Sequence, residues 1–116
     1  MIDYAEAQAA CETYIRSLQA SDVETLLALF DDNASIEDPV GTALREGKSA
    51  LREFYSVACE GVLSAALSGA PRLSGNEVAF PFTVTAGPVG QQLTINLIAV
   101  FNFNAAAKVV SMRAFG

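Results

Sequence analysis

The chain has 116 residues, of which 52% are hydrophobic and 17% are charged, so it can bury a core and is not expected to be disordered. We expect residues 1–116 to form one domain. The net charge of −6 disfavours nucleic acid and anionic membrane surfaces as partners. Histidine is absent, which excludes His-based triads, His general bases and His metal ligands.

The first predicted element is an amphipathic helix that begins after Asp3. Asp3 and Glu6 have the spacing of a capping box, in which each side chain accepts a hydrogen bond from the other residue's backbone N–H. Behind them, apolar side chains recur at helical spacing: Ala7, Cys11, Tyr14, Ile15 and Leu18. The pattern predicts a helix that ends near Ala20.

A shorter second helix is predicted to follow at once. Ser21 and Glu24 have the spacing of a second capping box. The apolar side of this helix consists of Val23, Leu26, Leu27 and Phe30. Residues 31–33, which are Asp-Asp-Asn, are expected to end it with a turn before a short strand over residues 34–37.

The third predicted helix is separated from that strand by a loop. Pro39 disfavours helix at Asp38, so residues 38–41 predict a turn, followed by a polar loop up to Gly47. The apolar positions of the helix are Leu51, Phe54, Tyr55 and Ala58. We expect this helix to close near Gly61.

After residue 61 the hydrophobic period changes to two, which is typical of strands. Residues 62–73 predict a weak, Ala-rich strand, and residues 78–85 a second one in which Pro81 indicates an edge or a bulge. Residues 93–103 and 109–115 predict two more, with turns at 87–90 and 104–108. Three N-terminal helices packed in a curved, mostly antiparallel sheet give an α+β fold, a conical barrel with an apolar interior suited to a ligand.

The two cysteines are Cys11 and Cys59, which do not have the spacing of a Cys-x-x-Cys pair. We expect both to be reduced, buried, small apolar side chains, and we therefore expect a cytoplasmic location. The first residues lack the basic and apolar regions of a signal peptide. No apolar run reaches the roughly 18 residues that suggest a transmembrane helix.

Three residues form the candidate chemical site. Without histidine, proton transfer can use a carboxylate base together with a phenol that binds the oxyanion. Asp38 stands at a strand end among apolar residues, where burial would raise its pKa. Tyr14 and Tyr55 lie on the apolar sides of two predicted helices, so their hydroxyls could bond in series. The pattern alone leaves open that Asp38 is only a turn residue and that the tyrosines are only packed aromatics.

Five stretches of the chain carry a family resemblance. They are Ala-Leu-Phe at 28–30, Glu-Asp-Pro-Val-Gly at 37–41, Arg-Glu-Phe-Tyr at 52–55, Asn-Glu-Val-Ala-Phe-Pro-Phe-Thr-Val at 76–84 and Lys-Val-Val-Ser-Met-Arg-Ala at 108–114. With them the chain resembles the bacterial ketosteroid isomerases over essentially its whole length. The resemblance implies a conical α+β fold, a homodimer, and an isomerase that moves a β,γ double bond of a 3-oxosteroid into conjugation. No metal or organic cofactor is expected, because the conjugation of the substrate delocalises the charge.

The resemblance also implies a role for particular residues. Asp38 matches the family's proton-shuttling base, Tyr14 its oxyanion-binding phenol and Tyr55 the supporting tyrosine. The positions that match the lining of the steroid cavity are Phe54, Phe82, Val84 and Met112. Ala99 stands where the family has a protonated Asp, so a second oxyanion donor is missing. The loss of one such donor typically costs about 3 kcal/mol, or roughly a hundredfold or more in rate.

Two alternatives to a weakened steroid isomerase remain open. One is a related cone-fold enzyme, such as a polyketide cyclase or an epoxide hydrolase. The hydrolase would need paired acids around an arginine, and no such set is evident in the sequence. The other is a protein that binds a steroid or another hydrophobic ligand with reduced catalysis, which Ala99 favours. The presence of Tyr14, Asp38 and Tyr55 together argues against that alternative.

Overall fold

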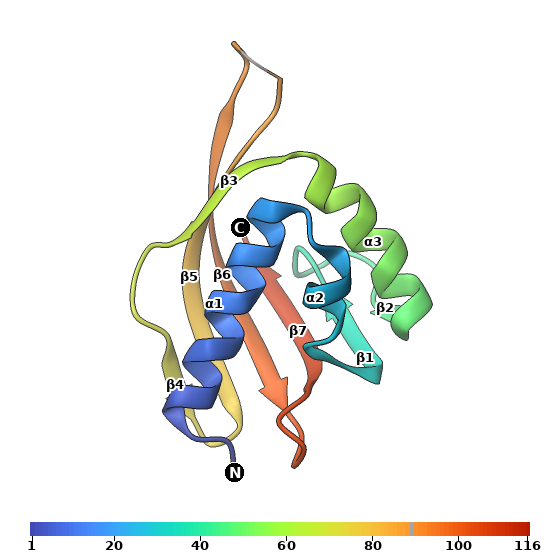
Figure 1. Cartoon of the computed structure of the whole chain (residues 1–116), viewed down its shortest axis with the longest axis vertical. Helices are drawn as coiled ribbons and strands as arrows, with labels where there is room; N and C mark the ends of the chain where they lie inside the picture. The colour runs from blue at the N-terminus through green and yellow to red at the C-terminus, as the bar shows by residue number, and fades with distance from the viewer. Residues whose placement is uncertain (89) are drawn as a thin grey trace.

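The computed structural model describes residues 1–88 and 90–116 as helices packed against a curved mixed sheet (Figure 1). The helices are α1 (Tyr4–Ala20), α2 (Val23–Leu27) and α3 (Lys48–Glu60). The strands are β1 (Phe30–Glu37), β2 (Arg45–Glu46), β3 (Val62–Leu67), β4 (Arg72–Ser74), β5 (Glu77–Ala86), β6 (Leu93–Phe103) and β7 (Val109–Phe115). The predicted α+β class is confirmed. None of the helices in the described ranges has both the length and the apolar character needed to cross a membrane.

The sheet has the strand order β2-β1-β7-β6-β5-β3, and β4 pairs with β5 beside β3. Every strand pair is antiparallel except β1 with β7, which is parallel. In Figure 1, α1 lies across the sheet, and α2 and α3 lie beside α1, on the side of β1. The helices and the inner face of the sheet therefore enclose the apolar interior between them.

Helix α1 begins as predicted. Asp3 accepts a hydrogen bond from the backbone N–H of Glu6 at 2.8 Å, and the Glu6 carboxylate accepts one from the N–H of Asp3 at 3.3 Å. The buried side of the helix includes Ala7, Cys11, Tyr14, Ile15 and Leu18. This side faces the sheet and brings Tyr14 into the interior.

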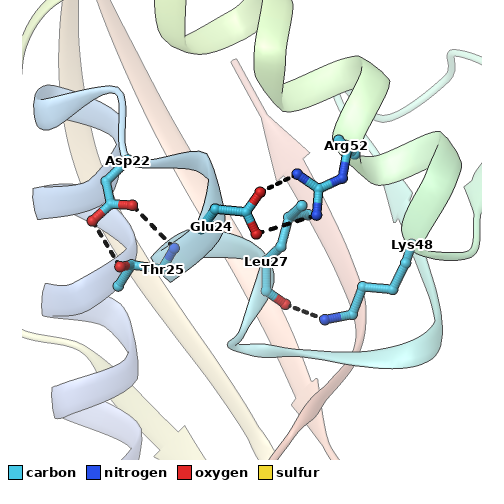
Figure 2. A network of polar contacts seen from close by, with 6 residues as sticks. All are labelled: Asp22, Glu24, Thr25, Leu27, Lys48 and Arg52. Carbon is cyan, nitrogen blue, oxygen red and sulfur yellow. Dashed lines mark hydrogen bonds and ion pairs between the residues drawn. The ribbon is translucent and has the colours of Figure 1, made fainter.

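The predicted second capping box is wrong. Asp22, not Ser21, caps α2, because its carboxylate accepts from the backbone N–H of Thr25 at 3.1 Å (Figure 2). Ser21 instead ends α1 in a left-handed conformation, and its hydroxyl donates to the carbonyl of Cys59 at 3.0 Å. The local spacing could not distinguish two adjacent capping residues, and the contact with the end of α3 decided between them.

Helices α2 and α3 are joined by polar contacts. Figure 2 shows the guanidinium of Arg52 on α3 paired with the carboxylate of Glu24 on α2, and the ammonium group of Lys48 donating to the carbonyl of Leu27. The Arg52–Glu24 pair is largely exposed, so it contributes little to stability by itself. Together with the contact of Lys48, the pair links α3, which carries Tyr55, to α2.

The strand after α2 starts earlier than predicted. Phe30 is the first residue of β1 rather than the last of the helix, and residues 31–33 belong to the strand instead of a free turn. The pairing of β1 with β7 shifts register between Phe30 and Ser35, which accommodates these polar residues as an irregularity. Asp31 still makes a local contact there, because its carboxylate accepts from the N–H of Asn33 at 3.0 Å.

The strands of the second half follow the predicted alternation, except that residues 62–73 divide into β3 and β4. Pro81 lies where the outer neighbour of β5 changes: Phe82 pairs with β3, and Ala79 pairs with β4. A residue without an N–H is therefore tolerated inside this long strand. The inward-facing side chains of β5 and β6 include Phe80, Phe82, Ala99 and Phe101, all of which are buried.

Candidate functional site

A cavity of about 360 Å³ opens between α1, α3 and the inner face of the sheet. Cavities of about 300–1,000 Å³ are usual for small-molecule sites. Its lining residues are Tyr14, Leu18, Asp38, Pro39, Phe54, Tyr55, Ala58, Gly61, Val62, Phe82, Val84, Ala86, Ile95 and Leu97. Among these described lining residues, the polar side chains are those of Tyr14, Asp38 and Tyr55. The cavity therefore suits an apolar ligand that presents one polar group to this trio.

Asp38 is positioned by the end of β1 and by β7. The N–H of Val40 donates to the carbonyl of Ala114 at 2.7 Å, which fixes the turn after Asp38 on the last strand of the sheet. The neighbouring carboxylate of Glu37 accepts from the N–H of Gly41 at 2.9 Å and pairs with Arg113 at 3.0 Å. Glu37 thus bonds the turn backbone, and within the described chain the Asp38 carboxylate makes no hydrogen bond. Asp38 is free to face the cavity.

Two opposing effects set the pKa of Asp38. Burial in an apolar wall raises the pKa of its carboxyl group, and the positive charge of Arg45 lowers it by a smaller amount. The net effect is a pKa above the ordinary value for aspartate. In its ionised form, a carboxylate of this kind is a stronger base than an exposed aspartate.

Tyr14 and Tyr55 meet inside the protein. Their hydroxyl oxygens are 3.0 Å apart, and their rings make an edge contact with centroids 5.9 Å apart. Both side chains are almost fully buried, with 2% and 1% of their surface exposed. Burial raises the pKa of both phenols, and for Tyr14 the hydrogen bond from Tyr55 partly opposes that rise. Both phenols therefore stay protonated at neutral pH and can donate.

The direction of this hydrogen bond matters for the chemistry. If the Tyr55 hydroxyl donates to the oxygen of Tyr14, the proton of Tyr14 is available for an acceptor in the cavity. Donation from Tyr55 also polarises the Tyr14 hydroxyl, which makes Tyr14 the stronger donor. The pair can thus act as one relay that ends at the ligand.

Around position 99 the interior is apolar and shielded from solvent. Ala99 is completely buried and lies opposite Phe80 on β5 and Ala114 on β7. The ring of Phe80 contacts Tyr14 with centroids 6.0 Å apart, and that of Phe101 contacts it at 5.2 Å. Aromatic groups therefore surround the part of the interior where a second donor would be expected.

The structure brings most of the proposed site residues to one cavity. Tyr14, Asp38 and Tyr55 line it together, and so do three of the residues proposed to hold the ligand, namely Phe54, Phe82 and Val84. Ala99 and Met112 are buried in the adjacent core and are not among the lining residues. No group of three or more Cys, Asp or Glu side chains that could hold a metal occurs in residues 1–88 and 90–116.

Sequence reasoning did not single out Arg45. It lies on the short strand β2, directly opposite Ile36 of β1 in the antiparallel pair. Its guanidinium lies over the ring of Phe54, with its central carbon 4.6 Å from the ring centroid. A two-residue strand within a polar loop gives almost no sequence signal. The Ile36–Arg45 pairing, which places Arg45 near Asp38, could be recognised only from the structure.

Comparisons with known proteins agree with this architecture. The family model of the SnoaL-like domain matches residues 11–112. A curated relative, the steroid Delta-isomerase of Nocardioides simplex, is 34% identical over 111 residues, which cover 96% of this chain and 89% of that protein. A solved structure of SalBIII aligns with a TM-score of 0.88 and 28% identity. SalBIII is described as an epoxide hydrolase/cyclase-like enzyme with a role in pyran ring formation in the polyether salinomycin. That alignment covers 99% of this chain and 93% of the other. The chain therefore belongs to the SnoaL-like domain family of cone-fold proteins and is ketosteroid isomerase-like.

Proposed function

We propose that the protein is a steroid Δ-isomerase that moves a β,γ double bond of a 3-oxosteroid into conjugation with the ketone. One observation carries the proposal: Asp38, Tyr14 and Tyr55 are the polar side chains among the described residues of an otherwise apolar cavity. A purely hydrophobic binding pocket requires none of the three. The identity with a steroid Delta-isomerase over 96% of the chain supports the same reaction class.

The reaction begins with the ionised Asp38 carboxylate. Asp38 takes a proton from the carbon between the ketone and the alkene, and the electrons of that C–H bond delocalise onto the ketone oxygen as a dienolate. The Tyr14 hydroxyl donates to this oxygen, where the negative charge develops, and Tyr55 donates to Tyr14. The apolar walls exclude water, which strengthens these interactions.

The second half of the reaction returns the same proton. The protonated Asp38 donates it to the far carbon of the original double bond, the ketone re-forms, and the conjugated enone leaves. Asp38 is ionised again, so the cycle consumes no external proton or electron. Its raised pKa suits both halves, because the group must accept and release a proton at similar cost.

Because Ala99 has no side-chain donor, this site should stabilise the oxyanion less than a site with two hydrogen-bond donors. Phe80 and Phe101 pack near Tyr14 and offer no donor, so Tyr14, with Tyr55 donating to it, is the side-chain donor proposed for the ligand oxygen. One missing donor typically lowers the rate about 10²–10³-fold. We therefore propose an isomerase that works through Tyr14 alone and is slow relative to a two-donor enzyme.

Turnover of 5-androstene-3,17-dione, followed by the ultraviolet absorbance of the conjugated enone, tests the proposal. The protein should convert the substrate, and Asp38→Asn should abolish conversion because an amide cannot act as the base. Glu37→Gln is the matched control: it neutralises the adjacent carboxylate, which pairs with Arg113 and is not among the cavity-lining residues. Absence of turnover in the parent protein and also in Ala99→Asp would refute the isomerase reading.

Cyclase-like chemistry is the second candidate, because the solved structure of an epoxide hydrolase/cyclase-like enzyme matches nearly the whole chain. Such a reaction could also use one acid and a pocket that stabilises an enolate. An epoxide hydrolase would need two acids around an arginine, whereas Asp38 is the acidic side chain among the described lining residues. Steroid binding without turnover would favour the other alternative, a ligand-binding protein.

We also propose that the protein is a homodimer formed through the outer face of the sheet. Ile98 of β6 and Phe115 of β7 are direct cross-strand neighbours on that face, with 50% and 43% of their surface exposed. Pro81 lies opposite Ile98 on the other side. These residues form an apolar strip suited to a second copy. The two free, buried cysteines suit a reducing compartment such as the cytoplasm.

A further inference from the structure

Arg45 carries a positive charge that acts on the proposed base, and nothing in the reaction as described above uses it. Asp38 directly follows Glu37, the last residue of β1, and lies two residues beyond Ile36. Arg45 lies directly opposite Ile36 in the pair of β1 with β2, and its positive charge acts on the Asp38 carboxylate. The two charges are near enough to interact but do not form an ion pair within 4.0 Å in the described chain.

The guanidinium of Arg45 has an unusual environment. Its Nη1 atom is buried and has no hydrogen-bond partner in the described chain. A buried donor without a partner is costly, and a charged donor more so, which suggests that another requirement holds it there. The guanidinium lies over Phe54, 4.6 Å from the ring centroid, which is the geometry of a cation–π contact.

Phe54 links this contact to the ligand cavity. Together with Ala58 it lines both the cavity of Asp38 and a second pocket of about 430 Å³, which Arg45 also lines. The ring of Phe54 also packs edge-on against Tyr55, with centroids 5.0 Å apart. Movement of Phe54 would therefore disturb both the cavity wall and the tyrosine pair, and Arg45 covers Phe54 from the other side.

We propose that Arg45 is a positioning residue for the reaction at Asp38, which holds the Phe54 wall in place and fixes a positive charge beside the carboxylate. This inference rests on the proposed function for its kinetic consequences. Its electrostatic part does not depend on turnover, since it concerns only the free protein.

The electrostatic consequence has a definite sign. The groups that face Asp38 are Tyr14 from α1, Tyr55 from α3 and Arg45 from β2, and both phenols are neutral at the pH of interest. Glu37, next to Asp38, is paired with Arg113 at 3.0 Å. Removal of the Arg45 charge leaves burial unopposed, so the pKa of Asp38 should rise further.

The test compares Arg45→Met, which keeps an apolar stem over Phe54, with Arg45→Gln and Arg45→Lys. Arg52→Gln is the control, because it removes the same charge from an exposed ion pair on α3. The titration of Asp38 is followed by carbon NMR of proteins labelled at the aspartate carboxyl carbon, and Asp38→Asn identifies the signal. The Asp38 midpoint should move to higher pH in Arg45→Met and Arg45→Gln, return toward the parent value in Arg45→Lys, and not change in Arg52→Gln.

An unchanged midpoint in Arg45→Met and Arg45→Gln would overturn the proposal, whether or not the protein turns over a steroid. If the isomerase assay succeeds, the same variants should show a several-fold loss of kcat/KM on the acidic side that becomes smaller toward pH 8. In Arg45→Met, which keeps the stem over Phe54, a loss of the same size at every pH would also contradict the proposal. Should one neutral variant fail to fold, the other still gives the titration, because Met and Gln differ in polarity but neither carries a charge.

Discussion

The hydrogen bond between Tyr14 and Tyr55 allows stability and catalysis to be separated in one set of variants. The two hydroxyls are 3.0 Å apart in a site where 2% and 1% of the side-chain surfaces are exposed, and neither hydroxyl has another partner in the described chain. Tyr14→Phe and Tyr55→Phe each remove one oxygen and keep the ring packing. The double variant removes both and leaves no unpaired hydroxyl.

The expected changes in stability follow from what each variant leaves behind. A single substitution leaves one buried hydroxyl without its partner, which costs about 1–3 kcal/mol. For a chain of this length, each kcal/mol lowers Tm by about 4 °C. Replacement of both partners by groups of the same shape is close to neutral. The double variant should therefore unfold near the parent Tm, with a coupling energy of at least about 1 kcal/mol.

The expected changes in activity follow a different order. Tyr14→Phe removes the proposed oxyanion donor and should lower kcat about 10²–10³-fold. Tyr55→Phe should lower it less, because Tyr14 keeps its own proton and loses only the polarising bond. The double variant should be stable and as inactive as Tyr14→Phe. Urea unfolding and initial rates on the same preparations supply both sets of numbers.

Two results would refute this reasoning. If the double variant lost as much stability as the two single variants together, the hydroxyls would not be coupled and the 3.0 Å contact would carry no energy. If Tyr55→Phe lowered kcat as strongly as Tyr14→Phe, Tyr55 would contact the ligand oxygen itself. Phe103→Leu, at a buried position whose ring contacts Phe101 and not the two tyrosines, is a control for general loosening of the interior.

Three further predictions concern other parts of the molecule. Ala99→Asp should raise kcat up to about a hundredfold, but it should lower stability by about 1–3 kcal/mol because a larger side chain enters a fully buried position. Thermal melts and initial rates of one preparation test this prediction, and lower activity would contradict it. Asp38→Asn should stabilise the protein at pH 7, because a raised carboxyl pKa gives stability that is present below the unfolded pKa and is lost as pH rises through the folded value. The difference in Tm from the parent should shrink toward pH 3, and a constant difference would be inconsistent with burial as its cause. Phe115→Asp should convert the proposed dimer to a monomer in sedimentation experiments. The matched control is Leu63→Asp, at an exposed position on β3, which should not change the oligomeric state. A monomeric parent protein would contradict the proposed interface.

Local signals predicted the helices well and the start of the sheet poorly. The capping box of Asp3 and Glu6 predicts the start of α1, because the contacts involved span only three residues. At Ser21 and Asp22 two competing local patterns overlap, and a hydrogen bond to Cys59, 38 residues away, decides between them. Residues 31–33 have the composition of a turn, but they lie within β1 as an irregularity between Phe30 and Ser35, which pair with β7.

The candidate site was predicted to a similar degree. The family resemblance predicted Phe82 and Val84 in the cavity wall, and the structure adds Ile95 and Leu97 from β6 to the same cavity. The contact between Arg45 and Phe54 was not predicted, because it depends on a two-residue strand within a loop. A strand of two residues is too short to show a hydrophobic period in the sequence, so the contacts that it makes cannot be predicted from the pattern.

The position of β7 between β1 and β6 has a consequence for how the site can form during synthesis. The turn that follows Asp38 is bonded to Ala114, so residues far apart in the chain must meet before the carboxylate is held in place. Contacts of such large sequence separation form slowly. A nascent chain that has exposed α1 to β6 still lacks the strand between β1 and β6, so the turn after Asp38 cannot be anchored until residues 109–115 have left the ribosome.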